Sequence, residues 1–246
     1  MFKYERAERI VEILKKQKYT TVDFLVNELH YSPATIRRDL TYLEANGLVK
    51  KSYGGVSINE YAKPVIIREH ENIDIKTKIA KKASDLINDY NSVFVDGTTT
   101  TYFLAEFLKN KKNITVTTSN LKLATYLGEN KVNCYVTGGK VVDTNMLCGN
   151  FADEMMKKMC FDIAFFSVAA LSYDGEISCM SEVFLNIIHT AIQRSKISVC
   201  MCGSTKLGIK KTLCLENLQN VNYVISDGKF PYELKKKYPN TKFITV

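Results

Sequence analysis

The chain has 246 residues, of which 46% are hydrophobic and 24% are charged, and this composition excludes a disordered protein. It is long enough for one large domain or for two ordinary domains, each with its own core. The formal net charge of +8 favours an anionic partner. Residues 1–57 hold ten Lys/Arg and seven Asp/Glu, or +3, which leaves +5 for the rest of the chain. A nucleic-acid hypothesis therefore has to rest on where the basic residues lie.

Cysteine and histidine usage argues against a metal site. The seven cysteines are an odd number, lie mostly inside apolar runs and include no CxxC pair, and the three histidines are far apart. The spacing of a zinc site is absent, so we predict neither a metal nor a cofactor, and we favour reduced thiols over disulfides. The first residues, MFKYERAERIVEIL, lack the apolar core of a signal peptide, and no run approaches the length of a membrane span. We expect a cytoplasmic protein that does not associate with a membrane.

Two amphipathic helices are predicted first. Residues 4–16 place their apolar side chains on one helical stripe, and residues 20–30 (TTVDFLVNELH) indicate a second helix. Thr20 and Asp23 have the spacing of a capping box at the start of this second helix.

A third helix and a β-ribbon follow. Ser32 is a preferred N-cap and is followed by a proline, and Asn46-Gly47 is a good stop. The next segment, LVKKSYGGVSI, alternates and breaks at Gly54-Gly55, as two short strands around a turn do. Three helices and a small ribbon predict a winged helix-turn-helix over residues 1–57, in which the third helix is the recognition helix.

The predicted recognition helix carries two adjacent arginines. Ile36, Leu40 and Leu43 share one stripe, and Arg38 lies roughly opposite it without an acidic residue four positions away. An arginine can donate two hydrogen bonds to a guanine edge, and lysines of the wing can hold phosphates. The alternatives are a solvated surface helix and a helical protein–protein module of the same fold. The candidate DNA-binding residues are Ser32, Thr35, Arg37, Arg38, Thr41, Lys50 and Lys51.

Beyond a weakly patterned stretch over residues 58–75, interpreted as a linker, the periodicity changes. Apolar or β-branched runs are found at residues 92–96, 114–119, 132–138, 161–169, 197–203 and 221–227. Helix-like stretches lie between several of them, at residues 76–90, 101–109, 120–128 and 181–194. Buried strands that alternate with helices predict a mostly parallel α/β domain over residues 76–246.

The stretch VDGTTTT (95–101) places a Gly-Thr turn between a predicted strand and a predicted helix. Backbone N–H groups at a helix start, together with threonine hydroxyls, can cradle a phosphate. The loop lacks the Gly-Lys-Ser/Thr of a Walker A motif, which argues against nucleotide hydrolysis. Asp96 would repel a phosphate, so we expect it to accept hydrogen bonds from a sugar hydroxyl. Ordinary threonine-rich capping is the alternative.

Further small or hydroxylated residues recur where other predicted strands end, in TTSN (117–120), TGG (137–139) and GSTKLG (203–208). Ligands of α/β sheets bind at the carboxyl ends of the strands, and a lysine there can neutralise a phosphate or a carboxylate. The candidate effector-binding residues are Asp96, Gly97, Thr98, Thr99, Thr100, Ser119, Asn120, Gly138, Gly139 and Lys206.

No nucleophile–base pair, pair of acids or set of metal ligands can be placed in the sequence, which points away from an enzyme. The run FDIAFFSVAAL holds no acid between Asp162 and Asp174, and His189 lies in an apolar helix where packing explains it.

With these residues assembled, the chain resembles the DeoR-type family of bacterial transcriptional repressors from residue 4 to about residue 227. The motifs that carry the resemblance are SPATIRRDLTYLEANGLVKKSYGG, Arg68, KTKIA from Lys76, DGTTTT, TSN, TGG and STKLG. The resemblance implies a winged DNA reader, a sensor similar in fold to ribose-5-phosphate isomerase, and phosphorylated sugars as effectors. Two positions depart from the family pattern: Tyr53 stands where a histidine is usual, and Gly203 where an aspartate is frequent.

The favoured hypothesis is therefore a sugar-phosphate-responsive repressor that binds double-stranded operator DNA as a homo-oligomer. An active sugar-phosphate isomerase with an appended DNA-binding domain is the competing hypothesis, and it requires an acid–base pair beside the phosphate cradle. A scaffolding protein is a third hypothesis, which leaves DGTTTT without explanation.

Overall fold

The computed structural model of the protein describes residues 3–45, 48–58, 65–142, 145–182 and 185–246. The chain divides into two compact units, Met1–Glu71 and Asn72–Val246, each described here by itself. The segment interpreted as a linker, residues 58–75, includes helix α4 and the start of helix α5. Among the described residues, no helix is long and apolar enough to cross a membrane.

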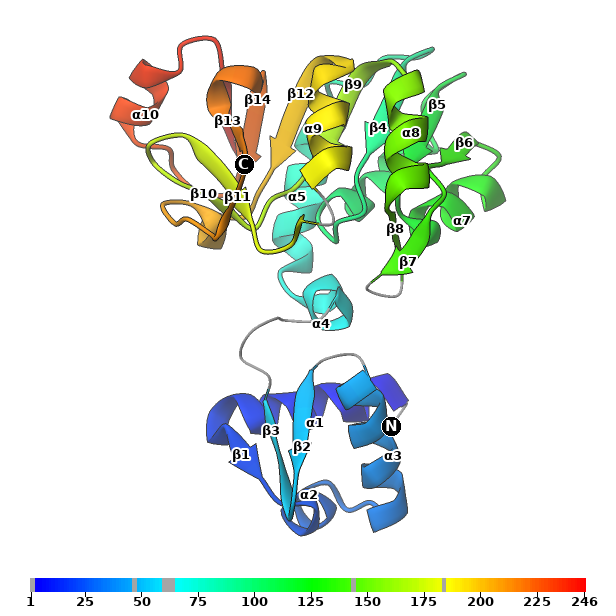
Figure 1. Ribbon diagram of the computed structural model, residues 1–246, viewed down its shortest axis with the longest axis vertical. Helices are drawn as coiled ribbons and strands as arrows, with labels where there is room; N and C mark the ends of the chain where they lie inside the picture. The colour runs from blue at the N-terminus through cyan, green and yellow to red at the C-terminus, as the bar shows by residue number, and fades with distance from the viewer. Residues whose placement is uncertain (1–2, 46–47, 59–64, 143–144, 183–184) are drawn as a thin grey trace. The chain divides into compact units, whose positions relative to one another are not determined.

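The first unit is a helix-turn-helix with a three-stranded antiparallel sheet (Figure 1). Its helices are α1 (Lys3–Gln17), α2 (Val22–Leu29), α3 (Pro33–Ala45) and α4 (Val65–His70). Its strands are β1 (Tyr19–Thr20), β2 (Val49–Ser52) and β3 (Gly55–Ile58), in the order β1-β3-β2. The predicted stripe of Ile36, Leu40 and Leu43 is fully buried in the core of this unit, with apolar side chains of α1, α2, β2 and β3.

The caps of the two central helices differ in how well they were predicted. Ser32 caps α3, because its Oγ accepts a hydrogen bond from the backbone N–H of Thr35 at 3.2 Å. The prediction that Thr20 caps α2 is wrong, because Thr20 pairs with Val56 in the sheet and the N-cap is Thr21. Thr21 accepts from the backbone N–H of Phe24, so no capping box with Asp23 forms. The predicted stop at Asn46-Gly47 lies outside the described residues.

A charged pair that the sequence analysis did not identify links α1 to α3. The carboxylate of Asp39 is 1% exposed and accepts hydrogen bonds from Nε and, at 3.1 Å, from Nη2 of Arg6. This contact raises the pKa of Arg6, whose guanidinium also lies 4.7 Å from the centre of the Tyr31 ring. The aspartate next to Arg38 is therefore directed into the protein, where it pairs with Arg6 and not with Arg38.

The second unit contains a seven-stranded parallel sheet in the order β15-β14-β12-β9-β4-β5-β6. These strands are β4 (Ser92–Val95), β5 (Thr115–Thr118), β6 (Asn133–Val136), β9 (Phe161–Phe166), β12 (Ser195–Met201), β14 (Tyr223–Ser226) and β15 (Lys242–Thr245). All six predicted strands are present and parallel, which confirms a mostly parallel α/β domain. The seventh, β15, was not predicted.

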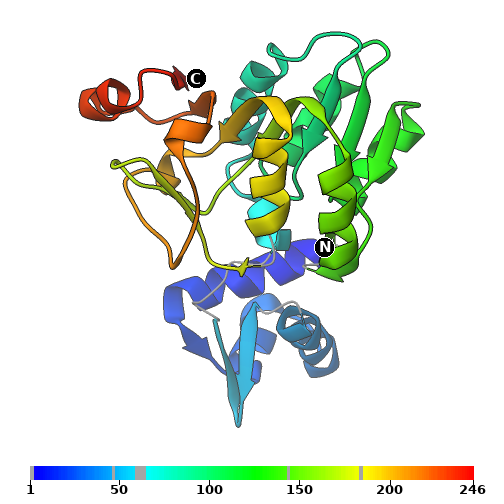
Figure 2. The same ribbon diagram turned by 45° about the horizontal axis from the view of Figure 1, so that its top comes forward.

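Helices cover both faces of this sheet (Figures 1 and 2). On one face lie α5 (Ile73–Ser84), α6 (Ala105–Leu108) and α7 (Leu121–Glu129), which pack on Val93, Val95 and other buried strand residues. On the other face α8 (Asn150–Lys158) and α9 (Leu185–Gln193) lie side by side and pack on Phe94 and Ala164. Strand residues thus alternate between two cores, and this is why the strands are apolar throughout.

Shorter elements border the sheet. A hairpin is formed by β7 (Lys140–Val142) and β8 (Met146–Cys148), and a small antiparallel sheet by β10 (Ala170–Leu171), β11 (Glu176–Cys179) and β13 (Leu213–Asn217). Helix α10 is Tyr232–Lys237, and the 3₁₀ helices are η1 (Thr101–Leu104), η3 (Ser204–Lys206) and η4 (Leu218–Asn220). All seven cysteines are free thiols, and two of them, Cys160 and Cys214, are exposed.

We expect Asp39→Asn to destabilise the first unit, because Arg6 then keeps a charge that is 13% exposed and has lost its carboxylate. Removal of one partner of such a pair should lower the free energy of unfolding by about 2–4 kcal/mol, measured by calorimetry of the full chain. The control is Glu44→Gln on the same helix. It removes an exposed ion pair to Lys51 of β2 and should lower the free energy of unfolding much less. Equal losses in the two variants would contradict a structural role for the Arg6–Asp39 pair.

Candidate DNA-binding surface and candidate effector site

The exposed face of α3 presents two arginines. Arg37 and Arg38 are exposed, and within the described part of the chain neither guanidinium forms a hydrogen bond or an ion pair. Ser32 and Thr35 precede them at the start of α3, where their hydroxyls are 2.9 Å apart and form the cap. The cap and the buried stripe fix the position of this end of the helix in the unit.

Strand β2 is tied to the same helix. The ammonium of Lys51 donates to Oγ1 of Thr41 at 3.0 Å and lies 2.9 Å from Oε2 of Glu44. The backbone N–H of Lys51 donates to the other oxygen of Glu44, and Lys51 lowers the pKa of that carboxyl. Lys50 is exposed on the same strand. The candidate residues Arg37, Arg38, Thr41, Lys50 and Lys51 therefore belong to two elements that lie against each other.

In the second unit, the strand order reverses between β4 and β9. From β4 the chain proceeds outward through β5 to β6, and later strands start at β9 on the other side. In open α/β sheets, ligands bind beyond the carboxyl ends of the strands at such a point. The loop that follows β4 is the DGTTTT segment predicted from the sequence.

Asp96 organises this loop. Its carboxylate is 2% exposed and accepts hydrogen bonds from the N–H and the hydroxyl of Thr98, from the hydroxyl of Thr101 and, at 2.9 Å, from the N–H of Ser167 after β9. Burial raises the pKa of Asp96, and the hydrogen bonds from Thr101, Ser167 and Thr98 oppose that shift. Both carboxylate oxygens have partners inside the protein, which argues against the expected direct contact of Asp96 with a sugar hydroxyl.

The loop leads into the predicted helix. Residues 97–100 form a bend and a turn, and the helical segment begins at Thr101, where the predicted helix over residues 101–109 starts, as η1 followed by the four-residue α6. The N–H groups of Gly97, Thr99 and Thr100, and the hydroxyls of Thr99 and Thr100, make no hydrogen bond with any part of the chain that the structure describes. The loop thus combines one fully bonded carboxylate with five unused donors.

Two residues after β5 hold the loop from its other side. The Nδ2 of Asn120 donates to the carbonyl of Gly97 at 3.2 Å, and its Oδ1 caps α7 by accepting from Leu123. A Cβ on Gly97 would meet Cε of Met146 at 2.7 Å and Oγ of Ser119 at 3.2 Å, so only glycine fits without displacement. The structure therefore brings Ser119 and Asn120 to the DGTTTT loop.

Lys206 follows β12, the neighbour of β9 on the side opposite β4. It ends η3, which follows β12, and its Nζ donates to Oγ of Ser167 at 3.2 Å. The same Ser167 donates its N–H to Asp96. A single serine therefore connects the loop after β4 to the late lysine. The sequence analysis did not select Ser167, because it placed this residue inside the run 161–169, whereas β9 ends at Phe166.

Gly138 and Gly139 lie after the edge strand β6, two strands from β4, and among the described residues no hydrogen bond joins them to the DGTTTT loop. Their φ angles are +72° and +105°, and a Cβ on Gly139 would lie 2.3 Å from the carbonyl oxygen of Cys148. These glycines allow the β7–β8 hairpin to fold back, and Leu147 of that hairpin donates its N–H to the carbonyl of Ser119. Their connection to the candidate site is indirect.

We expect Gly139→Ala to destabilise the second unit, because the new methyl group collides with backbone and the φ angle is strained. The loss in free energy of unfolding, followed by thermal denaturation, should exceed that of Gly138→Ala by roughly 1–3 kcal/mol. Gly138→Ala is the matched control, since its φ is also positive but nothing lies within 4 Å of its Cβ. Indistinguishable losses would show that the approach to Cys148 is unimportant.

Comparison with known proteins agrees with this geometry. The sequence matches the DeoR-like helix-turn-helix domain over residues 6–62 and the DeoR C terminal sensor domain over residues 71–228. The lactose phosphotransferase system repressor of Lactococcus lactis subsp. lactis is 33% identical over 183 residues, which cover 71% of this chain and 72% of that protein. The HTH-type transcriptional regulator GolR of Listeria innocua is 29% identical over 247 residues, which cover 97% and 96% of the two chains.

Among solved structures, ribose 5-phosphate isomerase A from Methanocaldococcus jannaschii is similar with a TM-score of 0.42 and 13% identity, over 56% of this chain and 55% of that one. The two domain matches together span most of the sequence, and the full-length relatives are regulators rather than enzymes. The helix-turn-helix of the first unit and the sensor domain of the second show that this protein is a DNA-binding member of the DeoR family of transcriptional regulators.

Proposed function

We propose that this regulator is a repressor of sugar-metabolism genes that binds operator DNA as a homo-oligomer and is released by a phosphorylated sugar. Residues 1–57 are the DNA-binding domain in this proposal, residues 58–75 connect it, and residues 76–246 sense the effector. The similar protein of Lactococcus lactis is named as a repressor of a lactose phosphotransferase system, which supports a sugar-related role.

The observation that carries the effector assignment is the DGTTTT loop with its unused donors. The N–H groups of Gly97, Thr99 and Thr100 and two hydroxyls remain for a ligand, whereas Asp96 is occupied in shaping the loop. Charge-assisted hydrogen bonds to a phosphate are stronger than bonds to a neutral group. Lys206 adds a full positive charge close to the loop, because its ammonium is hydrogen-bonded to Ser167, whose N–H is bonded to Asp96. An anionic group is therefore the ligand chemistry that this set of donors favours.

For the DNA-binding residues, the support is the two exposed arginines on α3, which have no partner among the described residues. In helix-turn-helix proteins the second helix of the motif enters the major groove. Arg38 lies opposite the buried stripe, and Lys50 on β2 is free to approach a phosphate. Effector binding then favours a conformation with low DNA affinity, since a ligand shifts a population toward the state it binds better.

The isomerase alternative lacks the acid–base pair it needs. Asp96 is buried with both oxygens hydrogen-bonded, so it is not free to remove a proton from a substrate. Asp162 lies at the amino end of β9, where it pairs with Lys196 at 2.8 Å, away from the DGTTTT loop. The purified protein should show no isomerisation of pentose or hexose phosphates.

One experiment tests the proposal as a whole. A thermal-shift screen of hexose and pentose monophosphates against the full chain, followed by DNA binding to its own promoter region with each hit, should identify a sugar phosphate that lowers operator affinity. A protein that binds the promoter but responds to none of the sugar phosphates, or only to unphosphorylated sugars, would contradict the effector assignment.

We expect Arg38→Ala to weaken binding to the operator by about 1–3 kcal/mol, the range for a bidentate base contact, and to change binding to random DNA little. Lys50→Ala should instead weaken binding to all sequences and reduce the slope of log K against log salt by about one. Fluorescence anisotropy with specific and random duplexes at several salt concentrations separates the two. Equal losses on both duplexes for Arg38→Ala would identify Arg38 as a phosphate contact.

We expect Lys206→Met to abolish or strongly weaken the response to the sugar phosphate while operator binding without effector stays intact, because the charge opposite the phosphate is lost. The control is Lys196→Met, which removes a lysine from the amino end of β12, the strand that precedes η3. Promoter binding titrated with effector is the measurement. If Lys206→Met responds like the parent protein, Lys206 does not contact the effector.

A further inference from the structure

The segment that carries Lys206 is a connection between two sheets. Residues 203–212, here called the strap, leave the main parallel sheet after β12 and enter the small sheet at β13. At its start, Ser204 donates its N–H and its hydroxyl to the carboxylate of Asp227, at 2.6 and 2.8 Å. Gly228 allows this close packing, since a Cβ there would lie 2.7 Å from Leu207. The start of the strap is thus anchored next to β14.

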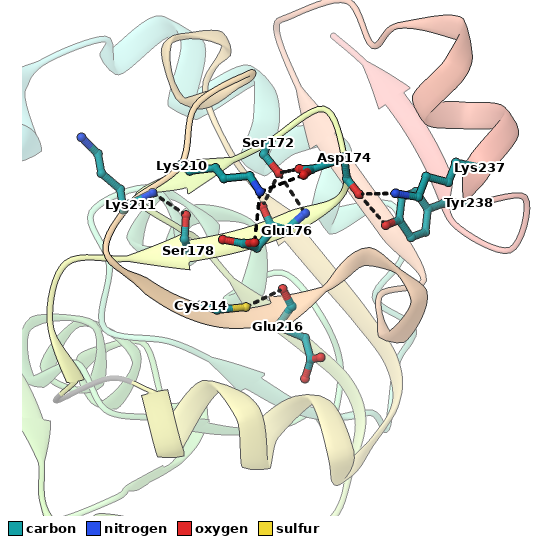
Figure 3. A network of polar contacts seen from close by, with 10 residues as sticks. All are labelled: Ser172, Asp174, Glu176, Ser178, Lys210, Lys211, Cys214, Glu216, Lys237 and Tyr238. Carbon is teal, nitrogen blue, oxygen red and sulfur yellow. Dashed lines mark hydrogen bonds and ion pairs between the residues drawn. The ribbon is translucent and has the colours of Figure 1, made fainter.

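The far end of the strap is held by charges on the β10–β11 hairpin (Figure 3). The Nζ of Lys210 lies 2.8 Å from Oδ2 of Asp174 and 3.2 Å from Oε2 of Glu176. Backbone bonds accompany these pairs, because Gly208 donates to the carbonyl of Leu171 at 2.8 Å and Lys211 donates its N–H to Ser178 at 2.8 Å. The side chain of Lys211 extends away from the network.

The hairpin itself is fixed on the C-terminal helix. Tyr238 donates its hydroxyl to the carbonyl of Asp174 at 2.7 Å, and Lys237 donates to the same oxygen at 2.9 Å (Figure 3). Gly175 has a φ of +94°, and a Cβ there would lie 2.2 Å from the Tyr238 ring. Asp174 is therefore held by its backbone, and its side chain is left for Lys210 and the hydroxyl of Ser172.

The charged contacts at the far end of the strap are exposed. Lys210 and Asp174 are 51% and 54% exposed, so their pairing is reversible and weakened by salt. Lys210 and Ser172 lower the pKa of Asp174 to about 2, so this carboxylate stays ionised at neutral pH. Lys206 lies between the anchored start and this exposed attachment, four residues before Lys210.

We propose that Lys210, paired with Asp174 and Glu176, is a positioning residue that holds the strap so that Lys206 faces the DGTTTT loop, and thereby sets the affinity for the anionic effector. The inference rests on the proposed function, since it assigns Lys206 to the effector site. The physical reason is distance: the attraction between an ammonium and a phosphate falls as the two separate, and solvent screens it further. The pairs at Lys210 reduce the freedom of the strap and keep that distance short.

The test uses the full chain and inorganic phosphate as the probe, with ionic strength kept constant by sodium chloride. Phosphate-induced shifts in the melting temperature are measured for the parent protein, Lys206→Met, Lys210→Met and the Lys206→Met/Lys210→Met double variant. Lys211→Met is the matched control, since it removes the same charge one residue along the strap, and Lys211 forms no ion pair with any described residue. Asp174→Asn is a second way to break the contact, and it leaves the backbone bonds to Tyr238 and Lys237 in place.

Lys210→Met and Asp174→Asn should each weaken phosphate binding about two- to fivefold, the range for exposed ion pairs, and Lys211→Met should leave it unchanged. The salt dependence of phosphate binding should be less steep in Lys210→Met than in the parent. In the double variant, loss of Lys210 should have no further effect, because it acts through Lys206.

Two results would overturn the inference in distinguishable ways. If Lys206→Met abolishes phosphate binding but Lys210→Met behaves like Lys211→Met, the strap contact does not position Lys206, and the proposed effector site stands. If Lys206→Met leaves phosphate binding unchanged, the effector site itself is wrong and the positioning role falls with it.

Discussion

The candidate effector site depends on the buried carboxylate of Asp96. It joins the loop after β4 to the end of β9, and these are the two strands between which the strand order reverses. An unpartnered charge there would be costly, and the hydrogen bonds from Thr98, Thr101 and Ser167 offset that cost while fixing the shape of the loop. The N–H groups of Gly97, Thr99 and Thr100 have no hydrogen-bond partner in the described part of the chain. In the proposed site, Asp96 shapes the loop that carries these donors.

The same device organises the DNA-binding unit. Asp39 is on the buried side of α3 and forms an ion pair with Arg6 of α1. This ion pair, together with apolar packing, holds α3 against the first helix. In each unit the carboxylate of a buried aspartate is hydrogen-bonded within the protein, and exposed groups of candidate sites lie next to it in the sequence. A negative charge in the sequence beside a candidate anion-binding residue is thus no argument against that residue when the charge is directed inward.

Much of the fold was predictable because periodicity and caps are local signals. The stripe of Ile36, Leu40 and Leu43, the Ser32 cap and all six predicted parallel strands agree with the structure. The errors arose where tertiary contacts compete with local preference. Thr20 has the chemistry of an N-cap but pairs with β3, so Thr21 takes that place. The β15 strand was missed because its run is short and its residues are only partly buried at the sheet edge.

The sequence by itself determined the fold class and the winged helix-turn-helix, and it led to the two candidate surfaces, because apolar spacing and turn residues are signals within consecutive positions. Only the tertiary structure decided which separated groups meet. The link from Asp96 through Ser167 to Lys206 requires β4, β9 and β12 to be neighbours, and that order is a property of the whole sheet. The contact of Lys210 with Asp174 likewise joins the strap before β13 to the turn between β10 and β11. Contacts between distant residues carry no local pattern, so no window of sequence could have revealed them.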